Sequence, residues 1–256
     1  MSKAELIKKI TMKKEFSQLP KKDIILAFEK FDKDEYSDEE KFKFTRDLLR
    51  KVFSAFTSRK ILSLKDKNEE WILKKHLSTR ERFSHYEEIY LKLLKNFNKN
   101  ATVMDLGAGV NGFSYNYFKK IKFNINYIAI ESIGQLVSLT NNYFKENKIK
   151  AKAIHLSLFE LEKIKKIIIK TKKPRIVFLF KVIDSLEMLE RDYSKKLISE
   201  ISPLVDKIVL SFATKSMIKR KKFKVRRNWI INFIKENFKI IDDFEIRDER
   251  YIIFKK

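Results

Sequence analysis

The sequence predicts an α/β protein in which a helical N-terminal region precedes a mixed sheet of seven strands. Up to about residue 98, apolar residues recur at helical spacing and no glycine occurs. From residue 101 onward, short apolar runs alternate with amphipathic segments, which is typical of a largely parallel, doubly wound sheet. Only Arg247-Asp248-Glu249 separates the last two apolar runs, so we expect a C-terminal β-hairpin with one antiparallel strand.

The N-terminal helices are predicted from apolar residues that lie three or four positions apart. Pro20 separates the first two helices. Ser37, followed by three acidic residues, predicts the N-cap of the third helix. The last helix of this region is expected from about Ser84 to Leu94, with its tyrosines and aliphatic residues facing inward.

Strands and helices then alternate along the rest of the chain. The candidate strands are Ala101–Leu106, Tyr127–Glu131, Lys152–Leu156, Arg175–Phe180, Lys207–Phe212, Ile240–Ile246 and Arg250–Phe254. The candidate helices are Phe113–Lys120, Gln135–Lys145, Leu158–Ile169, Leu186–Ile201 and Trp229–Phe238. Five alternating units followed by a hairpin is the element order of the Rossmann-like class I S-adenosylmethionine (SAM) methyltransferases.

Charge is the most unusual feature of the composition. The chain of 256 residues has 58 Lys and Arg against 34 Asp and Glu, a net charge of +24. Such a charge favours a polyanionic partner such as nucleic acid, although a lysine-rich genome would also raise it. There is no apolar run long enough to span a membrane and no apolar core of a secretory signal at the N-terminus, so we expect a cytoplasmic protein. Without cysteine, and with three scattered histidines, a metal site is not expected.

Three of the four glycines lie close together, at Gly107, Gly109 and Gly112, after the first predicted strand. Glycine allows tight turns and close approach of the backbone to a ligand, and the following helix offers free N–H groups. The spacing also matches the dinucleotide fingerprint of NAD-binding proteins, and a glycine turn without a ligand is the third possibility. Asp105 would repel a pyrophosphate but suits the cationic amino-acid end of SAM, so SAM is favoured over NAD.

Residues at the ends of the next two strands are candidates for the rest of the cofactor. Glu131 ends the second strand, where a carboxylate can accept hydrogen bonds from both ribose hydroxyls. Ser157 and Leu158 follow the third strand, where the adenine is expected. An aspartate would be more typical at Ser157, which makes this position an unusual one.

One motif before the first strand identifies a family. It reads His76-Leu77-Ser78-Thr79-Arg80-Glu81-Arg82. By itself it predicts a helix start, with Ser78 as N-cap and Glu81 completing a capping box. It also resembles the His-x-Ser-Thr-x-Glu-Arg stretch of the 16S ribosomal RNA guanine-N7 methyltransferases associated with aminoglycoside resistance.

Further segments resemble the same family in the same order, from about residue 76 to the end of the chain. They are Asp105–Asn111, Phe178–Lys181 and Ser211–Ser216. The chain departs from the family at the SAM loop, where Ala108 stands for Cys, and at three positions where the family has proline, namely Gly112, Asp184 and Ala213. Because proline stiffens loops, these changes affect the target-base pocket more than the cofactor pocket.

The resemblance implies a SAM-dependent methyltransferase that acts on guanine N7 in 16S rRNA. N7 carries a free lone pair, so positioning rather than a general base would drive the transfer, and the base must be flipped out of its stack. Lys181, at the end of the fourth strand, is the candidate for holding the target base or its phosphate. Arg82 is the candidate for the SAM carboxylate. The full cofactor set is Arg82, Asp105, Gly107, Ala108, Gly109, Glu131, Ser157 and Leu158.

A basic segment between residues 215 and 227 contains no acidic residue and predicts contact with RNA phosphates, although a solvated charge run would look similar. Its basic residues are Lys215, Lys219, Arg220, Lys221, Lys222, Lys224, Arg226 and Arg227. We therefore expect residues 1–98 to form a helical RNA-recognition domain and residues 99–256 a SAM-binding domain, with ribosomal RNA or the small subunit as partner and no required oligomer. The alternatives are another RNA or base atom, a non-catalytic RNA-binding module and, against Asp105, an NAD-dependent oxidoreductase.

Overall fold

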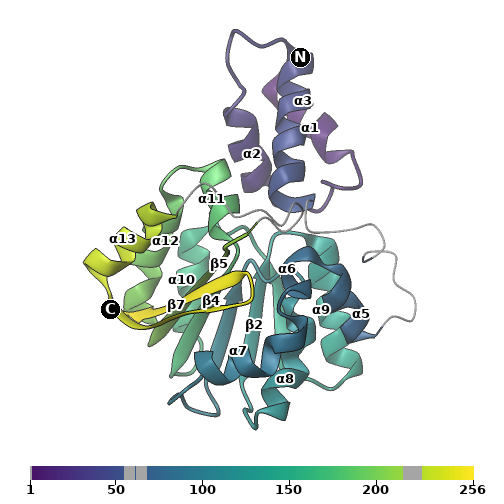
Figure 1. Cartoon of the computed structure of the whole chain (residues 1–256). Helices are drawn as coiled ribbons and strands as arrows, with labels where there is room; N and C mark the ends of the chain where they lie inside the picture. Colours follow the sequence, from purple (N-terminus) through teal and green to yellow (C-terminus); the bar gives the residue numbers. More distant parts are fainter. Residues whose placement is uncertain (1, 55–60, 62–67, 216–226) are drawn as a thin grey trace.

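The computed structural model describes residues 2–54, 61, 68–215 and 227–256, and shows a small helical lobe standing on an α/β core (Figure 1). The lobe contains α1 (Lys3–Thr11), α2 (Lys21–Glu29), α3 (Asp38–Leu49) and the π-helical turn η1 (Arg50–Ser54). The predicted N-cap of α3 is confirmed, because Ser37 and Glu40 form a capping box.

The next helices of the N-terminal region lie beside the sheet rather than in the lobe (Figure 1). They are α5 (Glu69–Lys75), α6 (Leu77–Arg80), η2 (Phe83–His85) and α7 (Tyr86–Leu93). The helix expected from Ser84 is confirmed as α7, whose inward face buries Tyr86, Ile89, Tyr90 and Leu93. The capping box expected at Ser78 is wrong. α6 begins after His76, with no side-chain cap.

Seven strands form one sheet in the order β3-β2-β1-β4-β5-β7-β6. They are β1 (Thr102–Leu106), β2 (Asn126–Glu131), β3 (Ala151–His155), β4 (Arg175–Phe180), β5 (Lys207–Ala213), β6 (Lys239–Ile246) and β7 (Glu249–Lys255). Strands β1 to β5 pair in parallel, and β7 pairs antiparallel with both β5 and β6, as the short connection requires. The predicted seven-stranded mixed sheet with a C-terminal hairpin is confirmed.

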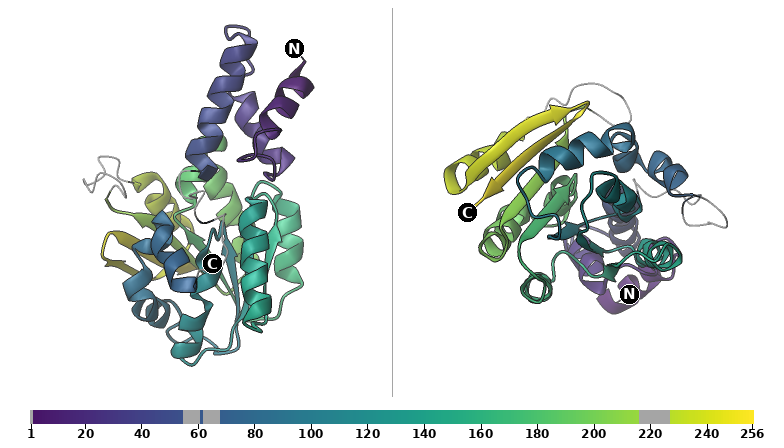
Figure 2. Two further views of the ribbon diagram at one scale, coloured as in Figure 1. Left: turned by 90° about the vertical axis from the view of Figure 1, so that its right-hand side faces the viewer. Right: turned by 90° about the horizontal axis from the view of Figure 1, so that it is seen from below.

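Helices cover both faces of this sheet, as the view from below shows (Figure 2). One face packs against α7, η3 (Asn111–Ser114), α8 (Tyr115–Lys120) and α9 (Gly134–Glu146). The other packs against α10 (Leu161–Ile169), α11 (Ile183–Leu189), α12 (Tyr193–Ile201), η4 (Ser202–Leu204) and α13 (Asn228–Asn237). Successive residues of a strand are buried on opposite faces of the sheet, because side chains alternate along a strand. In β1, for example, Val103 belongs to the apolar core on one face and Met104 to the core on the other.

The single helix expected over Leu186–Ile201 is wrong, because the chain breaks between α11 and α12. Asp192 has a left-handed backbone with φ of 60°, which ends helical geometry. The carboxylate of Glu187 then accepts hydrogen bonds from the backbone N–H groups of Asp192, at 2.6 Å, and Ser194, at 2.9 Å. A side chain of α11 thereby caps the start of α12.

The lobe sits over the edge of the sheet at which the parallel strands end (Figure 2). Its buried residues belong to the same apolar cluster as the α7–α9 face, so lobe and core share a continuous interior. At the contact, the N–H of Gly134 donates to the carbonyl of Gln18 at 3.3 Å, and Gln135 Nε2 donates to the carbonyl of Lys14 at 3.3 Å. Within the described ranges, no helix is long and apolar enough to cross a membrane.

Candidate active site

A cavity of about 740 Å³, its open mouth included, lies between the lobe and the carboxyl ends of the parallel strands. The position is where doubly wound folds bind ligands. Its walls come from the glycine loop, the ends of β2, β3 and β4, helix α11, and Asp23, Val52 and Phe53 of the lobe. Of the cofactor residues predicted from sequence, the walls contain Gly107, Gly109, Glu131 and Leu158.

The glycine loop needs glycine at two positions. Gly107 and Gly109 have φ of 75° and 55°, in the left-handed region that side chains disfavour. A Cβ at Gly107 would lie 2.6 Å from Val182 Cγ2, and one at Gly109 would lie 3.2 Å from His76 Cε1. The loop therefore presents bare backbone to the cavity, as close approach of a ligand requires.

Asp105 is fully buried behind this loop, not on the cavity wall. It accepts hydrogen bonds from Asn111 Nδ2 at 2.7 Å and from the Tyr127 hydroxyl at 2.6 Å, and its Oδ1 has no hydrogen-bond partner among the described residues. Burial raises the pKa of Asp105, and the two donors oppose that rise. Ala108, within the loop itself, is buried and does not line the cavity, and its N–H donates to the carbonyl of Ile130.

Glu131, at the end of β2, fixes the loop relative to the sheet. Its Oε2 accepts from the N–H of Gly109 at 2.8 Å, and its Oε1 accepts from the N–H of Ile133 at 2.8 Å. Burial raises the pKa of this carboxyl, and the backbone donors lower it. Since each carboxylate oxygen accepts more than one hydrogen bond, Glu131 retains capacity for a ligand on the cavity side.

Ser157 lies beneath the wall and binds a residue that the sequence did not single out. Its hydroxyl donates to Asp23 of α2 and accepts from the N–H of Phe159 at 3.0 Å. Burial raises the pKa of Asp23 to about 6, while the hydroxyls of Ser157 and Ser132 lower it. An acidic residue in the first turn of a helix normally indicates only a favourable interaction with the helix dipole, so no local signal marks Asp23.

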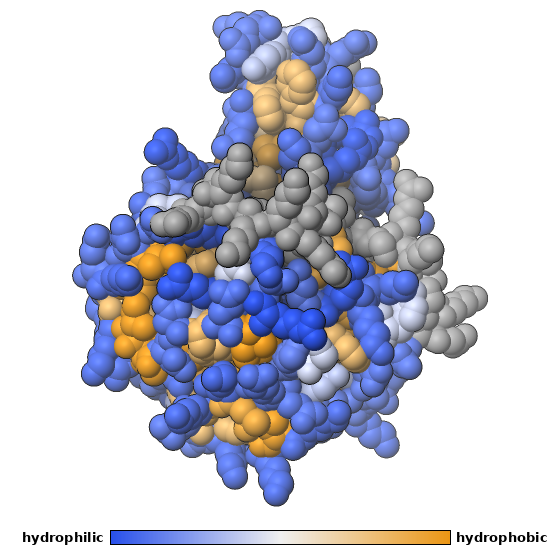
Figure 3. Space-filling model, viewed as in Figure 1, coloured by the Kyte–Doolittle hydropathy of each residue, from blue (hydrophilic) through white to orange (hydrophobic). Residues whose placement is uncertain are grey.

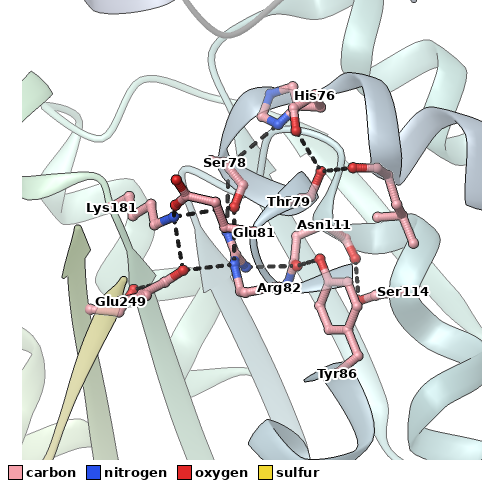
Figure 4. A network of polar contacts seen from close by, with 12 residues as sticks. His76, Ser78, Thr79, Glu81, Arg82, Tyr86, Asn111, Ser114, Lys181 and Glu249 are labelled. Atoms are coloured by element: carbon pink, nitrogen blue, oxygen red, sulfur yellow. Dashed lines mark hydrogen bonds and ion pairs between the residues drawn. The ribbon is translucent and has the colours of Figure 1, made fainter. Parts of the chain in front are cut away.

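Lys181 lines the cavity at the end of β4, where its backbone φ of 55° turns the chain away from the strand. Its ammonium pairs with Glu81 and, at 2.9 Å, with Glu249 of β7 (Figure 4). Burial raises the pKa of Glu249, but Arg82 and Lys181 outweigh that effect, and the pKa is lowered. Instead of capping α6, Glu81 therefore holds a lysine one hundred residues further along the chain.

Arg82 is buried in the same network and does not line the cavity. Its guanidinium donates to Asn111 Oδ1 at 2.9 Å, pairs with Glu249 at 3.4 Å and lies over the ring of Phe180 (Figure 4). Asn111 also accepts from the Tyr86 hydroxyl at 2.8 Å. The motif at residues 76–82 thus ties the glycine loop, β4 and β7 together from behind the cavity.

His76 is a cavity residue to which the sequence assigned no role. Burial, assisted by the positive charges of Arg82 and Lys181, lowers its pKa to about 3, so the ring is neutral at physiological pH. Its edge faces Gly109 across the loop. In the part of the chain that the structure describes, no cluster of His, Asp and Glu has the arrangement of a metal site.

The structure describes two residues of the predicted RNA-binding segment, Lys215 and Arg227. Lys215 pairs with Asp248 at 2.6 Å, and Arg227 pairs with Asp184 at 2.6 Å and donates to the carbonyl of Ala213. Both ends of the segment are therefore tied to the core. Its other basic residues lie outside the described residues: Lys219, Arg220, Lys221, Lys222, Lys224 and Arg226.

The sheet order and the glycine-lined cavity at its carboxyl edge define a class I SAM-dependent methyltransferase fold. The model of the ribosomal RNA methyltransferase (FmrO) family matches residues 44–237, most of the chain. The chain belongs to this family, which confirms the predicted enzyme class, an rRNA methyltransferase. A search of the curated proteins finds no significant match.

Solved structures show the same fold over the whole chain. The 16S rRNA methyltransferase RmtF, solved with S-adenosylhomocysteine, is similar with a TM-score of 0.80 and 17% identity, covering 100% of both chains. The 16S rRNA methylase RmtB is similar with a TM-score of 0.75 and 14% identity, covering 100% of this chain and 99% of its own. An rRNA methylase from Escherichia coli is similar with a TM-score of 0.76 and 14% identity, covering 99% of each chain.

Proposed function

We propose that the protein transfers a methyl group from SAM, bound in the cavity, to N7 of a guanosine in 16S rRNA. The observation that carries the proposal is the glycine loop. Two left-handed glycines present bare backbone to a cavity at the carboxyl ends of the parallel strands, where doubly wound folds bind ligands. Membership of the rRNA methyltransferase family supports the substrate class, and RmtF and RmtB, both described as 16S rRNA enzymes, support the choice of RNA.

The residues present fit SAM. A Cβ at Gly107 would meet Val182 and one at Gly109 would meet His76, so the loop beside the cavity accepts only glycine at these positions. Glu131 would accept hydrogen bonds from the ribose hydroxyls, and Leu158 contributes to an apolar wall for the adenine. Arg82, Asp105, Ala108 and Ser157 would act from behind the wall, by holding the loop and the strand ends in position. The bound cofactor supplies the electrophilic methyl group.

Lys181 is proposed to position the target base. Its ammonium reaches the cavity wall while Glu81 and Glu249 hold it from behind, so little side-chain entropy is lost when it meets an acceptor. The guanine O6 atom lies beside N7 and is such an acceptor. Because N7 needs no deprotonation, holding the flipped base in line with the methyl group is the main task of the protein.

The RNA is proposed to lie across the lobe and the basic segment, with residues 1–98 as the recognition region and the small ribosomal subunit of the cytoplasm as partner. The net charge of +24 supports binding to a polyanion. Hydrophilic residues dominate the face shown in Figure 3, over both the lobe and the core. The bordering residues Lys215 and Arg227 pair with Asp248 and Asp184, and Asp184 lies in sequence between the cavity residues Val182 and Ser185.

Transfer of tritiated methyl groups tests the proposal. The protein is incubated with labelled SAM and, separately, purified 30S subunits, 50S subunits and bulk tRNA. We expect label in the 16S rRNA of the 30S subunit. Label confined to 23S rRNA or tRNA would contradict the substrate, and RNA binding without any label would favour a non-catalytic module. In single-turnover reactions, Lys181→Met should slow transfer while SAM affinity measured by calorimetry stays within about twofold.

A further inference from the structure

A buried carboxylate from the lobe forms part of the cavity wall. Asp23 comes from the first turn of α2, far from the glycine loop in sequence, and only 1% of its surface is exposed. It meets the core where β2 and β3 end side by side, since Glu131 of β2 pairs in register with His155 of β3. Ser157, two residues beyond β3, donates its hydroxyl to Asp23.

One carboxylate oxygen of Asp23 can accept a further hydrogen bond. Its Oδ2 is buried and accepts no hydrogen bond of ordinary geometry from the described residues, although the Ser132 hydroxyl lies near enough to lower the pKa of the carboxyl. The ionisable groups that face it are Glu131, Glu160, His155 and Tyr193. A buried carboxylate oxygen without a donor is unfavourable, so this arrangement fits a site that a ligand completes.

The surroundings specify the chemistry of that ligand. Ile133, Leu158 and Phe159 give this end of the cavity apolar walls, which suit a flat heterocycle. The acidic residues Asp23 and Glu131 disfavour an anion there. Glu131, next to the glycine loop, is the acceptor for sugar hydroxyls, so Oδ2 of Asp23 is available to a donor beyond the sugar. A neutral ring that carries an N–H donor at its edge meets these conditions, and adenine with its exocyclic amino group is such a ring.

We infer that Asp23 accepts a hydrogen bond from the exocyclic amino group of the cofactor's adenine, and that the helical lobe thereby contributes to cofactor specificity. This inference rests on the proposed function, because it takes SAM as the ligand of the cavity. The lobe contacts at Gly134 and Gln135 hold α2 against the core, so the carboxylate is positioned before the ligand arrives. Cofactor binding and the docking of the lobe are then linked, since the same helix serves both.

Calorimetry with two ligands tests the inference. S-adenosylhomocysteine carries the amino group, and S-inosylhomocysteine carries an oxygen acceptor in its place. The wild-type protein should bind the adenosine ligand about 10- to 100-fold more tightly, the value of one hydrogen bond to a charged group. Asp23→Asn, which keeps the shape and can donate to the oxygen, should lose most of this preference. Asp34→Asn, at an exposed aspartate of the same lobe, is the matched control and should keep it.

The outcomes separate the two ideas. If Asp23→Asn lowers the affinity for both ligands by the same factor, or changes neither affinity, the carboxylate makes no specific contact with the amino group and the inference is overturned. If the wild-type protein binds neither ligand, the proposed cofactor itself is wrong. A thermal melt of each variant without ligand accompanies the titrations. A preference that is lost in a variant whose melting temperature is no lower than that of the wild type supports direct contact, and Asp23→Ser provides a second, smaller side chain should the asparagine variant fail to fold.

Discussion

Glu249 is the central anion of the buried network behind the cavity, and its neutralisation gives the sharpest stability prediction. The carboxylate lies between Arg82 and Lys181, and the side chains of all three are at most 4% exposed. Together with Glu81, these groups form a set of two cations and two anions. Glu249→Gln keeps the shape of the side chain but leaves one positive charge uncompensated.

The expected loss follows from the burial of the set. Removing one partner of a buried ion pair costs about 3–5 kcal/mol, because the remaining charge stays desolvated. For a protein of this size, each kcal/mol corresponds to about 2–4 °C in melting temperature, so a fall of roughly 6–20 °C is expected. Adding Lys181→Met to Glu249→Gln restores the charge balance, and the double variant should be more stable than the sum of the two single losses predicts.

Urea unfolding followed by circular dichroism measures these free energies. Asp243→Asn is the matched control, since Asp243 also pairs with an arginine, Arg250, but in a more exposed position, and should lose less than about 1 kcal/mol. Because the folded state lowers the pKa of Glu249, the stability it contributes is present above its ordinary value of 4.5 and is lost as pH falls through the folded value. The difference between wild type and Glu249→Gln should therefore shrink below about pH 4.5.

A loss below about 1 kcal/mol for Glu249→Gln, with additive effects of Lys181→Met, would refute this reasoning. Such a result would mean that water or another group compensates the charges, and that the set does not act as a unit.

Three further predictions follow from the site. Gly107→Ala should weaken binding of S-adenosylhomocysteine by more than about tenfold in calorimetry, because its Cβ would lie 2.6 Å from Val182 at a left-handed φ; unchanged affinity would count against the loop as the cofactor cradle. Asp23→Asn should stabilise the ligand-free protein by up to about 3 kcal/mol at pH 7.5. The pKa of the Asp23 carboxyl rises from 3.8 to about 6 on folding, so the folded wild-type protein loses stability as pH rises through that window, and the asparagine variant does not. Urea unfolding at a series of pH values should show this gain disappear towards pH 4, and a gain independent of pH would be contrary evidence. Replacing Lys221 and Lys222 by glutamine should reduce the slope of log affinity for RNA against log salt by about 1.4–1.8, and an unaltered slope would remove them from the RNA interface.

Much of the fold could be predicted because its signals are local. Every predicted strand lies within one residue of the observed one, since apolar runs of strand length are bounded by polar residues and turns. The hairpin followed from a connection too short for a crossover. The glycine loop could also be found, because clustered glycines in a chain that otherwise lacks them indicate a backbone requirement.

The contacts between distant segments could not be predicted in the same way. Ser78 and Glu81 have the spacing of a capping box, yet Glu81 pairs with Lys181 because folding brings β4 beside α6. Arg82 and Asp105 belong to the motifs, but only the packed structure shows that they lie behind the wall. Asp23 had no signal at all, since its role depends on how the lobe docks. The break at Asp192 required a left-handed residue that composition did not mark.

The identity of the methylated nucleoside tests the central claim most directly. The protein is incubated with SAM and 30S subunits, the 16S rRNA is digested to nucleosides, and the products are separated and identified by mass spectrometry beside synthetic standards. We expect 7-methylguanosine from the wild-type protein and no 7-methylguanosine above background from the Gly107→Ala variant. A methyl group on another atom of guanine, on adenine or on ribose would contradict the proposed function, because the proposed acceptor atom, N7, attacks the methyl group without losing a proton.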